Sequence, residues 1–416
     1  MSILERILLF VLLVLASGAG QGIFANPNVT TTAEGQPLTQ VAFAGLYLVF
    51  FLILLWKFRK TALFLIVKEK WTFLLCTWVL ASTLWSVGPG ETIRRALALV
   101  GTSIVGLYIG MRLEPKEQLK MIALIAGIGA IGSLAAGVLF PGIGITADGS
   151  WQGVYFPKNS LGRMMALSAI CFALLALGER RRRPIRIAMF LLSCLLLVLS
   201  KSATAVVVSF LIFALLPFRK LLYLRSRTFA AVSLVGGAVL ATVALWTADH
   251  LDDLLLSLGR TSSLTGRIPL WGYVIKAIAE RPFKGYGFGA FWNSWPGERV
   301  SDAAAWEVAV PHAHNGFLEM GLGIGAIGLV ILGIGMVVNF ISAVRVARSN
   351  RAVDQAWPLL LIIFTVLYNL TETSLLAVNS LMWMAYVANA FWLVRTTHER
   401  KFVEQPQELP EHAYSS

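Results

Sequence analysis

Long apolar runs recur along the whole chain and constrain its fold more than any other feature. A helix needs about 20 largely apolar residues to cross a bilayer. About twelve runs qualify, and 187–217 reads either as two short spans or as a re-entrant pair. The runs lie near 3–20, 38–56, 67–86, 92–110, 120–140, 160–178, 187–200, 203–217, 228–246, 316–341, 357–372 and 379–394. Only 14% of residues are charged, against about a quarter in soluble proteins, which excludes a single soluble domain, a disordered chain and a disulfide scaffold.

The positions of Lys and Arg indicate how these helices are oriented. A net charge of +13 would suggest a nucleic-acid partner in a soluble protein, but in a membrane protein basic residues mark cytoplasmic loops. With both termini inside, the cytoplasmic stretches hold 24 of the 35 basic residues. Topology therefore accounts for the charge, including the run Arg180–Arg183, although polybasic runs also bind anionic lipid. We expect no nucleic-acid partner.

These assignments predict an all-α, polytopic membrane protein of four parts. Residues 1–246 form an N-terminal membrane region of about nine spans, and 247–315 form a large periplasmic loop between spans 9 and 10. Residues 316–395 form a C-terminal membrane region of about three spans, and 396–416 form a polar cytoplasmic tail. The first run also resembles a signal peptide. Keeping it as a span leaves both ends inside, so we expect an uncleaved anchor.

The three cysteines, Cys76, Cys171 and Cys194, each lie within an apolar run and have no CxxC partner. We expect them to be buried small hydrophobic residues rather than disulfide partners or metal ligands.

Ionisable residues gather at the expected external ends of the spans, where they are costly to place and therefore candidates for function. Arginine can grip a pyrophosphate with two parallel hydrogen bonds, so a basic zone there suits a phosphate-carrying substrate at the membrane surface. The alternative is that long basic side chains simply extend to the interface. The zone contains Arg94, Arg95, Lys158, Arg163, Lys201, Arg260, Arg267, Glu319 and Glu372.

The large loop contains a predicted amphipathic helix over 267–280. Pro269 suits a first turn, and Arg281-Pro282 ends the helix. One face is apolar, since residues 271, 274, 275 and 278 are hydrophobic. The helix is too short to span, so we expect it on the membrane surface. Arg267 would lie beside its positive N-terminal end, which favours phosphate, unless Arg267 is only a solvated helix-start residue.

Two further motifs follow. The glycines of 285–292 alternate with other residues, but no strand precedes them and no Lys-Ser/Thr follows, so an aromatic interfacial turn is favoured over a nucleotide loop. His312 and His314 stand at the start of a span. In an extended chain their rings would point the same way and bind zinc if Asp302 or Glu307 supplied a third ligand.

The second hypothesis for His314 is a general base that draws a proton from a hydroxyl, with Asn315 or Glu319 orienting the ring. The third is an interfacial histidine that takes part in no chemistry.

The stretch His314–Glu319, with Gly321, Gly325 and Gly328 after it, resembles the C-terminal signature of the O-antigen ligase and Wzy-type polymerase superfamily. The preceding segment is also similar, and the pattern at 200–205 is most like that of exopolysaccharide polymerases. The similar positions of the preceding segment are 265–267, 270–271, 281–282 and 285–289. Trp85-Ser86 and Asn159 also resemble family positions.

The resemblance implies a metal-independent glycosyltransferase of the GT-C type, without cofactor, in the bacterial inner membrane and with a periplasmic active site. Its donor would be a glycan on undecaprenyl pyrophosphate. The acceptor would be another lipid-linked repeat in a polymerase, or lipid A-core in a ligase. Besides the substrate and the bilayer, polysaccharide assembly and export proteins are expected partners.

Arg267 would bind the pyrophosphate and His314 would act as the base. The expected substrate-binding residues are Lys201, Arg94, Arg163, Asn315, Glu319 and His312. Ligases of the family often carry a second arginine where this chain has Ala203, with Lys201 nearby, and this departure favours a polymerase. A transporter or flippase of lipid-linked sugars is the remaining alternative, but transporters place polar groups near the bilayer midplane.

Overall fold

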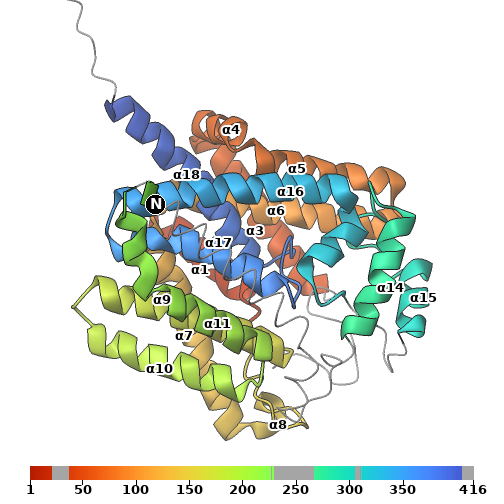
Figure 1. Cartoon of the computed structure of the whole chain (residues 1–416), viewed down its shortest axis with the longest axis horizontal. Coiled ribbons are helices and arrows are strands. Elements are labelled where there is room, and N and C mark those ends of the chain that lie inside the picture. Colours follow the sequence, from red (N-terminus) through yellow and green to blue (C-terminus); the bar gives the residue numbers. More distant parts are fainter. Residues whose placement is uncertain (21–36, 226, 229–266, 305–309, 311, 405–416) are drawn as a thin grey trace, which may run out of the picture.

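The computed structural model describes residues 1–20, 37–225, 227–228, 267–304, 310 and 312–404. Residues 229–266 and 405–416 therefore lie outside the description. They include nearly all of the expected span 228–246, the first part of the large loop and the end of the tail. Within those limits the chain is helical, with one isolated bridge between Ile145 and Trp151. Figure 1 shows long helices running roughly side by side, with α14 and α15 at one end of the bundle.

The helices of the N-terminal half begin and end as follows: α1 Ile3–Ala16, α3 Pro37–Lys57, α4 Arg59–Lys68, α5 Lys70–Ala81, α6 Pro89–Arg112, α7 Pro115–Leu139, α8 Pro141–Gly144, α9 Lys158–Gly178, α10 Arg183–Leu199 and α11 Ala203–Leu215. Those of the C-terminal half are α14 Arg267–Glu280, α15 Trp295–Ala303, α16 Gly316–Ser349, α17 Trp357–Asn369 and α18 Leu381–Glu404. Several begin with a proline in the first turn, where its missing N–H costs no helical hydrogen bond.

Among the described residues, six helices are long and apolar enough to cross a membrane. They are Leu38–Lys57, Pro89–Arg112, Pro115–Leu139, Lys158–Gly178, Ala203–Tyr223 and Gly316–Ser349, and Val353–Asn369 is a shorter apolar helix. Large apolar side chains also face outward, as Val41 and Phe210 do at 70% exposure each, which suits contact with lipid. The prediction of an all-α, polytopic membrane protein is confirmed, while a total of twelve spans stays a prediction.

Helix α16 differs from the single continuous span predicted over 316–341. It extends to Ser349 and is interrupted at Gly325, where φ is 63° and ψ is −171°. The peptide groups freed by the break pair with a neighbouring segment, as buried backbone groups in a membrane must. Ala326 N donates to Pro282 O at 2.7 Å, and Tyr286 N donates to Leu322 O at 2.7 Å.

The glycine-rich turn after Pro282 fits against this break. Gly285, Gly287 and Gly289 all have positive φ, and a Cβ at Gly285 would lie 2.5 Å from Leu322 O. Trp78 Nε1 donates to Ile324 O at 2.9 Å. The turn also contacts residues 82–86 after α5, since Phe288 N donates to Ser82 Oγ at 3.1 Å and Trp85 Nε1 donates to Lys284 O at 2.9 Å. It is therefore a packing element between that segment and the two halves of α16, with its rings largely buried, as Tyr286 and Phe291 are.

The three cysteines are free; Cys171 is buried, whereas Cys76 and Cys194 are only partly buried.

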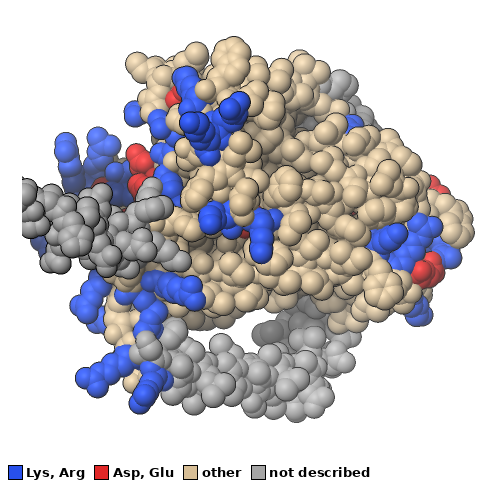
Figure 2. Space-filling model, turned by 90° about the horizontal axis from the view of Figure 1, so that it is seen from above, with Lys and Arg blue, Asp and Glu red and all other residues tan. Residues whose placement is uncertain are grey.

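The charged side chains divide the surface along the long axis of the molecule. Figure 2 shows most of the visible Lys and Arg side chains over one half of the face, reaching to its middle, and a smaller mixed group of basic and acidic side chains at the other end. The turn between α9 and α10, with Arg180–Arg183, lies at the first end, and α14 with α15 lies at the second (Figure 1).

Candidate functional site

The candidate site is built around the loop that follows α17. Residues at the starts of four helices form hydrogen bonds with residues 370–372 of this loop. Asn159 at the start of α9 donates to Glu372, Thr204 at the start of α11 lies 2.8 Å from the hydroxyl of Thr371, and Asn315 before α16 donates to Leu370 O at 2.9 Å. Arg267, the first residue of α14, forms the fourth contact by donating to Glu372. Four positive helix ends therefore meet at one place.

Helix α14 occupies the range predicted from the sequence, Arg267–Glu280, which confirms that prediction. Its buried face differs in part, because Leu270, Val274 and Ala277 are buried whereas Ile275 is 55% exposed. The helix packs against α16 through Ile278, which lies close to Gly321.

Arg267 and Glu372 form a mostly buried ion pair. One guanidinium nitrogen of Arg267 donates to Glu372 Oε1 at 2.8 Å, and another donates to the carbonyl of Thr371. The side chains are 15% and 8% exposed. Asn159 Nδ2 donates to the same carboxylate oxygen at 2.9 Å. These contacts fix the direction in which the guanidinium faces.

His314 lies on the other side of the same carboxylate. Its Nδ1 is 3.9 Å from Glu372 Oε2, and its side chain is 15% exposed. Burial opposes the charge on Glu372, but His314 and Arg267 outweigh that effect and hold the pKa of the carboxyl below its ordinary value. Glu372 therefore stays ionised between a guanidinium and an imidazole.

The two histidines do not form the extended pair assumed from the sequence. His314 has a φ of 51°, and its backbone N donates to His312 Nδ1 at 3.2 Å. The rings are 4.2 Å apart between centroids and inclined by 64°. Burial, and next the neighbouring His314, lower the pKa of His312 to about 4. His312 is thus a neutral acceptor that shapes the backbone beneath His314.

Asn315 and Glu319 contact the backbone that carries His314. Asn315 Oδ1 caps α16 by accepting from Phe317 N at 3.0 Å and Leu318 N at 3.1 Å. Glu319 Oε2 accepts from Ala313 N at 2.7 Å, and Trp292 Nε1 donates to the same carboxylate at 3.0 Å.

Arg163 on α9 faces the same region. It is close enough to affect the charge of His312, and its Nε is buried without a hydrogen-bond acceptor in the described part of the chain. Lys201 has a φ of 52° and donates instead to Asp148 O at 3.0 Å, in an exposed cluster with Lys158. The structure therefore brings Arg163 to the cluster of Arg267, Glu372 and His314, while the Nζ of Lys201 contacts a separate group.

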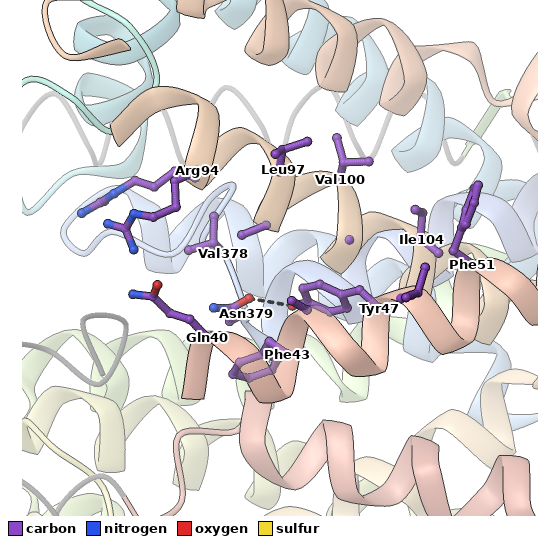
Figure 3. Close-up of a pocket in the computed structure, with 15 residues that line it drawn as sticks. Gln40, Phe43, Tyr47, Phe51, Arg94, Leu97, Val100, Ile104, Val378 and Asn379 are labelled. Carbon is purple, nitrogen blue, oxygen red and sulfur yellow. Dashed lines mark hydrogen bonds between the residues drawn. The ribbon is translucent and has the colours of Figure 1, made fainter. Parts of the chain in front are cut away.

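Arg94 lies at a third position, beside a cavity of about 420 Å³ between α3, α6 and residues 378–379. Figure 3 shows Arg94 at one end of this cavity and the apolar side chains of Leu97, Val100 and Ile104 extending away from it. Tyr47 donates to Asn379 Oδ1 at 2.7 Å. Arg94 itself is paired with Glu91 at 2.6 Å.

The zinc hypothesis required a third ligand near His312 and His314. In the described ranges, no three His, Cys, Asp or Glu side chains come together as a metal site. Glu307, one of the two proposed ligands, lies outside those ranges.

The sequence places Glu372 in the external ionisable zone and Asn159 among the family-like positions, but it indicates no catalytic or binding role for either of them or for Thr371. Glu372 carries a detectable signal, since it is a carboxylate at the very end of an apolar run. Its partners in the cluster are 105 and 213 positions away in sequence, so no local pattern pairs them.

The fold and this cluster define a polytopic membrane protein with an Arg–Glu–His site where several helices begin. Comparison with known proteins is consistent with that class. Residues 187–333 match the family model described as O-antigen ligase. This match supports the resemblance to the O-antigen ligase and Wzy-type superfamily that the sequence motifs indicate.

Two curated relatives are similar over a longer stretch. The chain is 26% identical over 294 residues to an exopolysaccharide production protein, ExoQ, of Rhizobium meliloti, a match that covers 66% of this chain and 65% of that protein. It is 25% identical over 277 residues to a putative polysaccharide ligase, RC0486, of Rickettsia conorii, covering 62% of this chain and 64% of that protein. The matches span just under two thirds of either relative.

Proposed function

We propose that the chain is a polysaccharide polymerase that joins undecaprenyl-pyrophosphate-linked oligosaccharide repeats into exopolysaccharide or O-antigen. In this proposal it lies in the bacterial inner membrane with both termini in the cytoplasm, and its site opens to the periplasm. The observation that carries the proposal is the meeting of four helix starts, Arg267 and His314 around residues 370–372. Such an arrangement favours a polyanion beside a base.

Arg267 binds the donor pyrophosphate. Glu372 and Thr371 O hold two of its guanidinium nitrogens, and the remaining N–H groups are the donors for phosphate oxygens. As the sugar–oxygen bond breaks, negative charge grows on the departing lipid pyrophosphate. The fixed guanidinium and the helix starts stabilise that charge without reorganising, which is how preorganised donors lower a barrier.

His314 acts as the general base. With its proton on Nδ1, which faces Glu372 at 3.9 Å, the neutral ring offers the lone pair of Nε2 to the acceptor hydroxyl. His314 takes the proton as the hydroxyl oxygen attacks the anomeric carbon, and the pyrophosphate leaves with the bonding electrons. Glu372 stabilises the imidazolium that forms, as a buried carboxylate does beside other catalytic histidines. This route requires no metal ion.

Several residues are assigned to substrate binding. Arg163 completes the anion site. Asn315, Glu319 and His312 hold the backbone around His314 in position and so orient its ring towards the substrate. Lys201 and Arg94 lie further out, beside Asp148 and at the cavity of Figure 3. The apolar length of that cavity and its basic end suit the lipid end of a substrate.

A ligase is the second candidate, because one relative is named a putative polysaccharide ligase and the family model is described as O-antigen ligase. A transporter is the third, and the break in α16 at Gly325 is the observation in its favour, since transporters use interrupted helices. The described charged groups of the candidate site lie at helix ends, which favours chemistry at the surface.

The glycan profile of a deletion strain tests the proposal. Loss of polymer with accumulation of single lipid-linked repeats is the result expected for a polymerase. Polymer stranded on the lipid carrier would establish the ligase instead. Retention of single repeats on the cytoplasmic side would indicate the transporter and contradict both enzymes.

A further inference from the structure

The polybasic turn between α9 and α10 lies beside a second groove, which the proposed reaction does not use. The groove has a volume of about 780 Å³ and runs between α7 and α10 over α9. The buried residues Phe172 and Leu175 of α9 form its floor. Its walls are outward-facing apolar side chains, among them Leu124, Ile128 and Ile185 at 54%, 50% and 64% exposure.

The charge lies at one end of this groove. The lining includes four cationic side chains and one carboxylate: Lys120, Arg181, Arg182, Arg186 and Glu179. Glu179 is already shared, because it pairs with Lys120 at 3.3 Å, with Lys116 at 2.6 Å and with Arg186.

Arg181 and Arg182 form no ion pair within the described ranges, and both are exposed. Arg182 also precedes α10, whose first amides receive no side-chain cap. The end of the groove thus offers two guanidinium groups without an acidic partner together with a positive helix end. An apolar channel with a positively charged end matches an amphiphile that has hydrocarbon chains and an anionic head.

We propose that the groove between α7, α9 and α10 binds an anionic phospholipid, with its acyl chains between α7 and α10 and its phosphate against Arg181 and Arg182. Basic pockets between membrane helices recognise anionic lipid heads in this way. The lipid joins α10 to α7 at the end of the bundle opposite to α14 and α15 (Figure 1). Topology explains why arginines occur in this turn and why apolar side chains face the lipid; the proposal rests on the groove over α9 that joins the two.

The test uses the purified full chain in detergent and measures the rise of its melting temperature when lipid is added. Phosphatidylglycerol is expected to stabilise the wild type, whereas phosphatidylcholine and glycerol phosphate alone are not. The double variant Arg181→Gln/Arg182→Gln should lose about 30-fold in apparent lipid affinity, or about fivefold for each arginine. The double variant Arg59→Gln/Lys60→Gln loses the same charge from the exposed start of α4 and should respond like the wild type.

A third variant separates the groove from general surface charge. Ile128→Trp fills the apolar channel and leaves every arginine in place, so it should also abolish the stabilisation by phosphatidylglycerol. Native mass spectrometry of each variant should show the matching loss of retained phospholipid. An unchanged response of Ile128→Trp, or equal responses to phosphatidylglycerol and phosphatidylcholine, would overturn the proposal. Stabilisation by glycerol phosphate alone would also overturn it and identify a phosphate site without a lipid.

Discussion

At the scale of single residues, Glu372 organises the candidate site. It accepts hydrogen bonds from Arg267 and Asn159 and lies near the ring of His314. A buried carboxylate with only one of these partners would be costly, because removing it from water is repaid only by several good contacts. The site is therefore a coupled unit in which the directions of the guanidinium and the imidazole depend on the same side chain.

The first prediction concerns the two residues that we assign to catalysis. Arg267→Ala removes the group that binds the pyrophosphate and His314→Ala removes the base. Each change should lower polymer synthesis at least about 100-fold, because loss of one preorganised group commonly costs that much. The measurement is the amount of high-molecular-weight polysaccharide made by a deletion strain complemented with each variant.

The matched control is Arg299→Gln, which removes an exposed arginine paired with Glu280 on the same side of the molecule. It should leave polymer length unchanged, and membrane levels of all three variants should equal those of the wild type. Polymer of normal length from either alanine variant at normal levels would refute the role of that residue.

The second prediction concerns acid stability. The pKa of His312 is lowered to about 4 by burial, so the unfolded chain binds a proton between about pH 6.5 and 4 that the folded chain does not. Stability should therefore fall as the pH falls through this window, by about 3 kcal/mol in total. His312→Asn keeps a polar side chain that does not titrate and should show a shallower loss.

The measurement is the melting temperature of the purified protein between pH 7 and 4.5 for both forms. Carboxylates such as Glu372, whose pKa lies below its ordinary value, lose their contribution only at lower pH and so contribute little to this range. Parallel curves for the wild type and His312→Asn would contradict a partly buried His312 that stays neutral.

At the scale of elements, the break in α16 is what joins the membrane bundle to the segment before it. The two halves of the helix meet at Gly325, and residues 282–287 supply partners for the peptide groups released there. Helix α14, which begins with Arg267, precedes this turn in the chain, and His314 precedes the broken helix α16. The contact between the turn and the break therefore sets the position of Arg267 relative to His314.

The third prediction follows from the geometry of that glycine. At Gly325 φ is 63°, and a Cβ would lie 2.4 Å from the carbonyl carbon of Phe283. Gly325→Ala should therefore destabilise the protein by at least about 2 kcal/mol, because alanine is strained at positive φ and here also collides with backbone. The melting temperature should fall accordingly, and polymer synthesis should fall with it.

Gly333→Ala is a matched control in the same helix, since nothing lies within 4 Å of its Cβ position. It should be neutral or slightly stabilising, as alanine favours a helix over glycine. Equal melting temperatures for the two variants would show that the break is not needed for folding.

Local elements are the part of the fold that the sequence predicts well. The range of α14 follows from signals within the helix itself, the early Pro269 and the closing Arg281-Pro282. The break at Gly325 gives no comparable signal, because glycines are frequent in membrane helices and α16 contains several. Only the tertiary pairing with residues 282–283 selects this one.

At the scale of the whole molecule, the candidate site likewise combines residues that local sequence signals predict with residues that only the folded chain brings in. The sequence predicts Arg267 and His314 as site residues because each stands beside a helix start, which is a local feature. Glu372, which lies between them, comes from another helix end, and its role appears only when the chain is folded. The same signal, a basic residue near a span end, also predicts Lys201, yet its amine contacts the carbonyl of Asp148.

The last prediction concerns orientation, on which the whole proposal depends. The candidate site and the polybasic turn occupy opposite ends of the bundle (Figure 1), and most Lys and Arg residues lie in the stretches assigned to the cytoplasm. A cysteine introduced at the exposed Glu298 should react in intact spheroplasts with a membrane-impermeant maleimide. A cysteine at the exposed Asn350 should react only after the membrane is opened. The parent protein, whose three cysteines are buried or partly buried, measures the background. Labelling of Asn350→Cys but not Glu298→Cys in intact spheroplasts would place the Arg–Glu–His site in the cytoplasm, where it would have no access to a periplasmic glycan, and would rule out the polymerase and the ligase together.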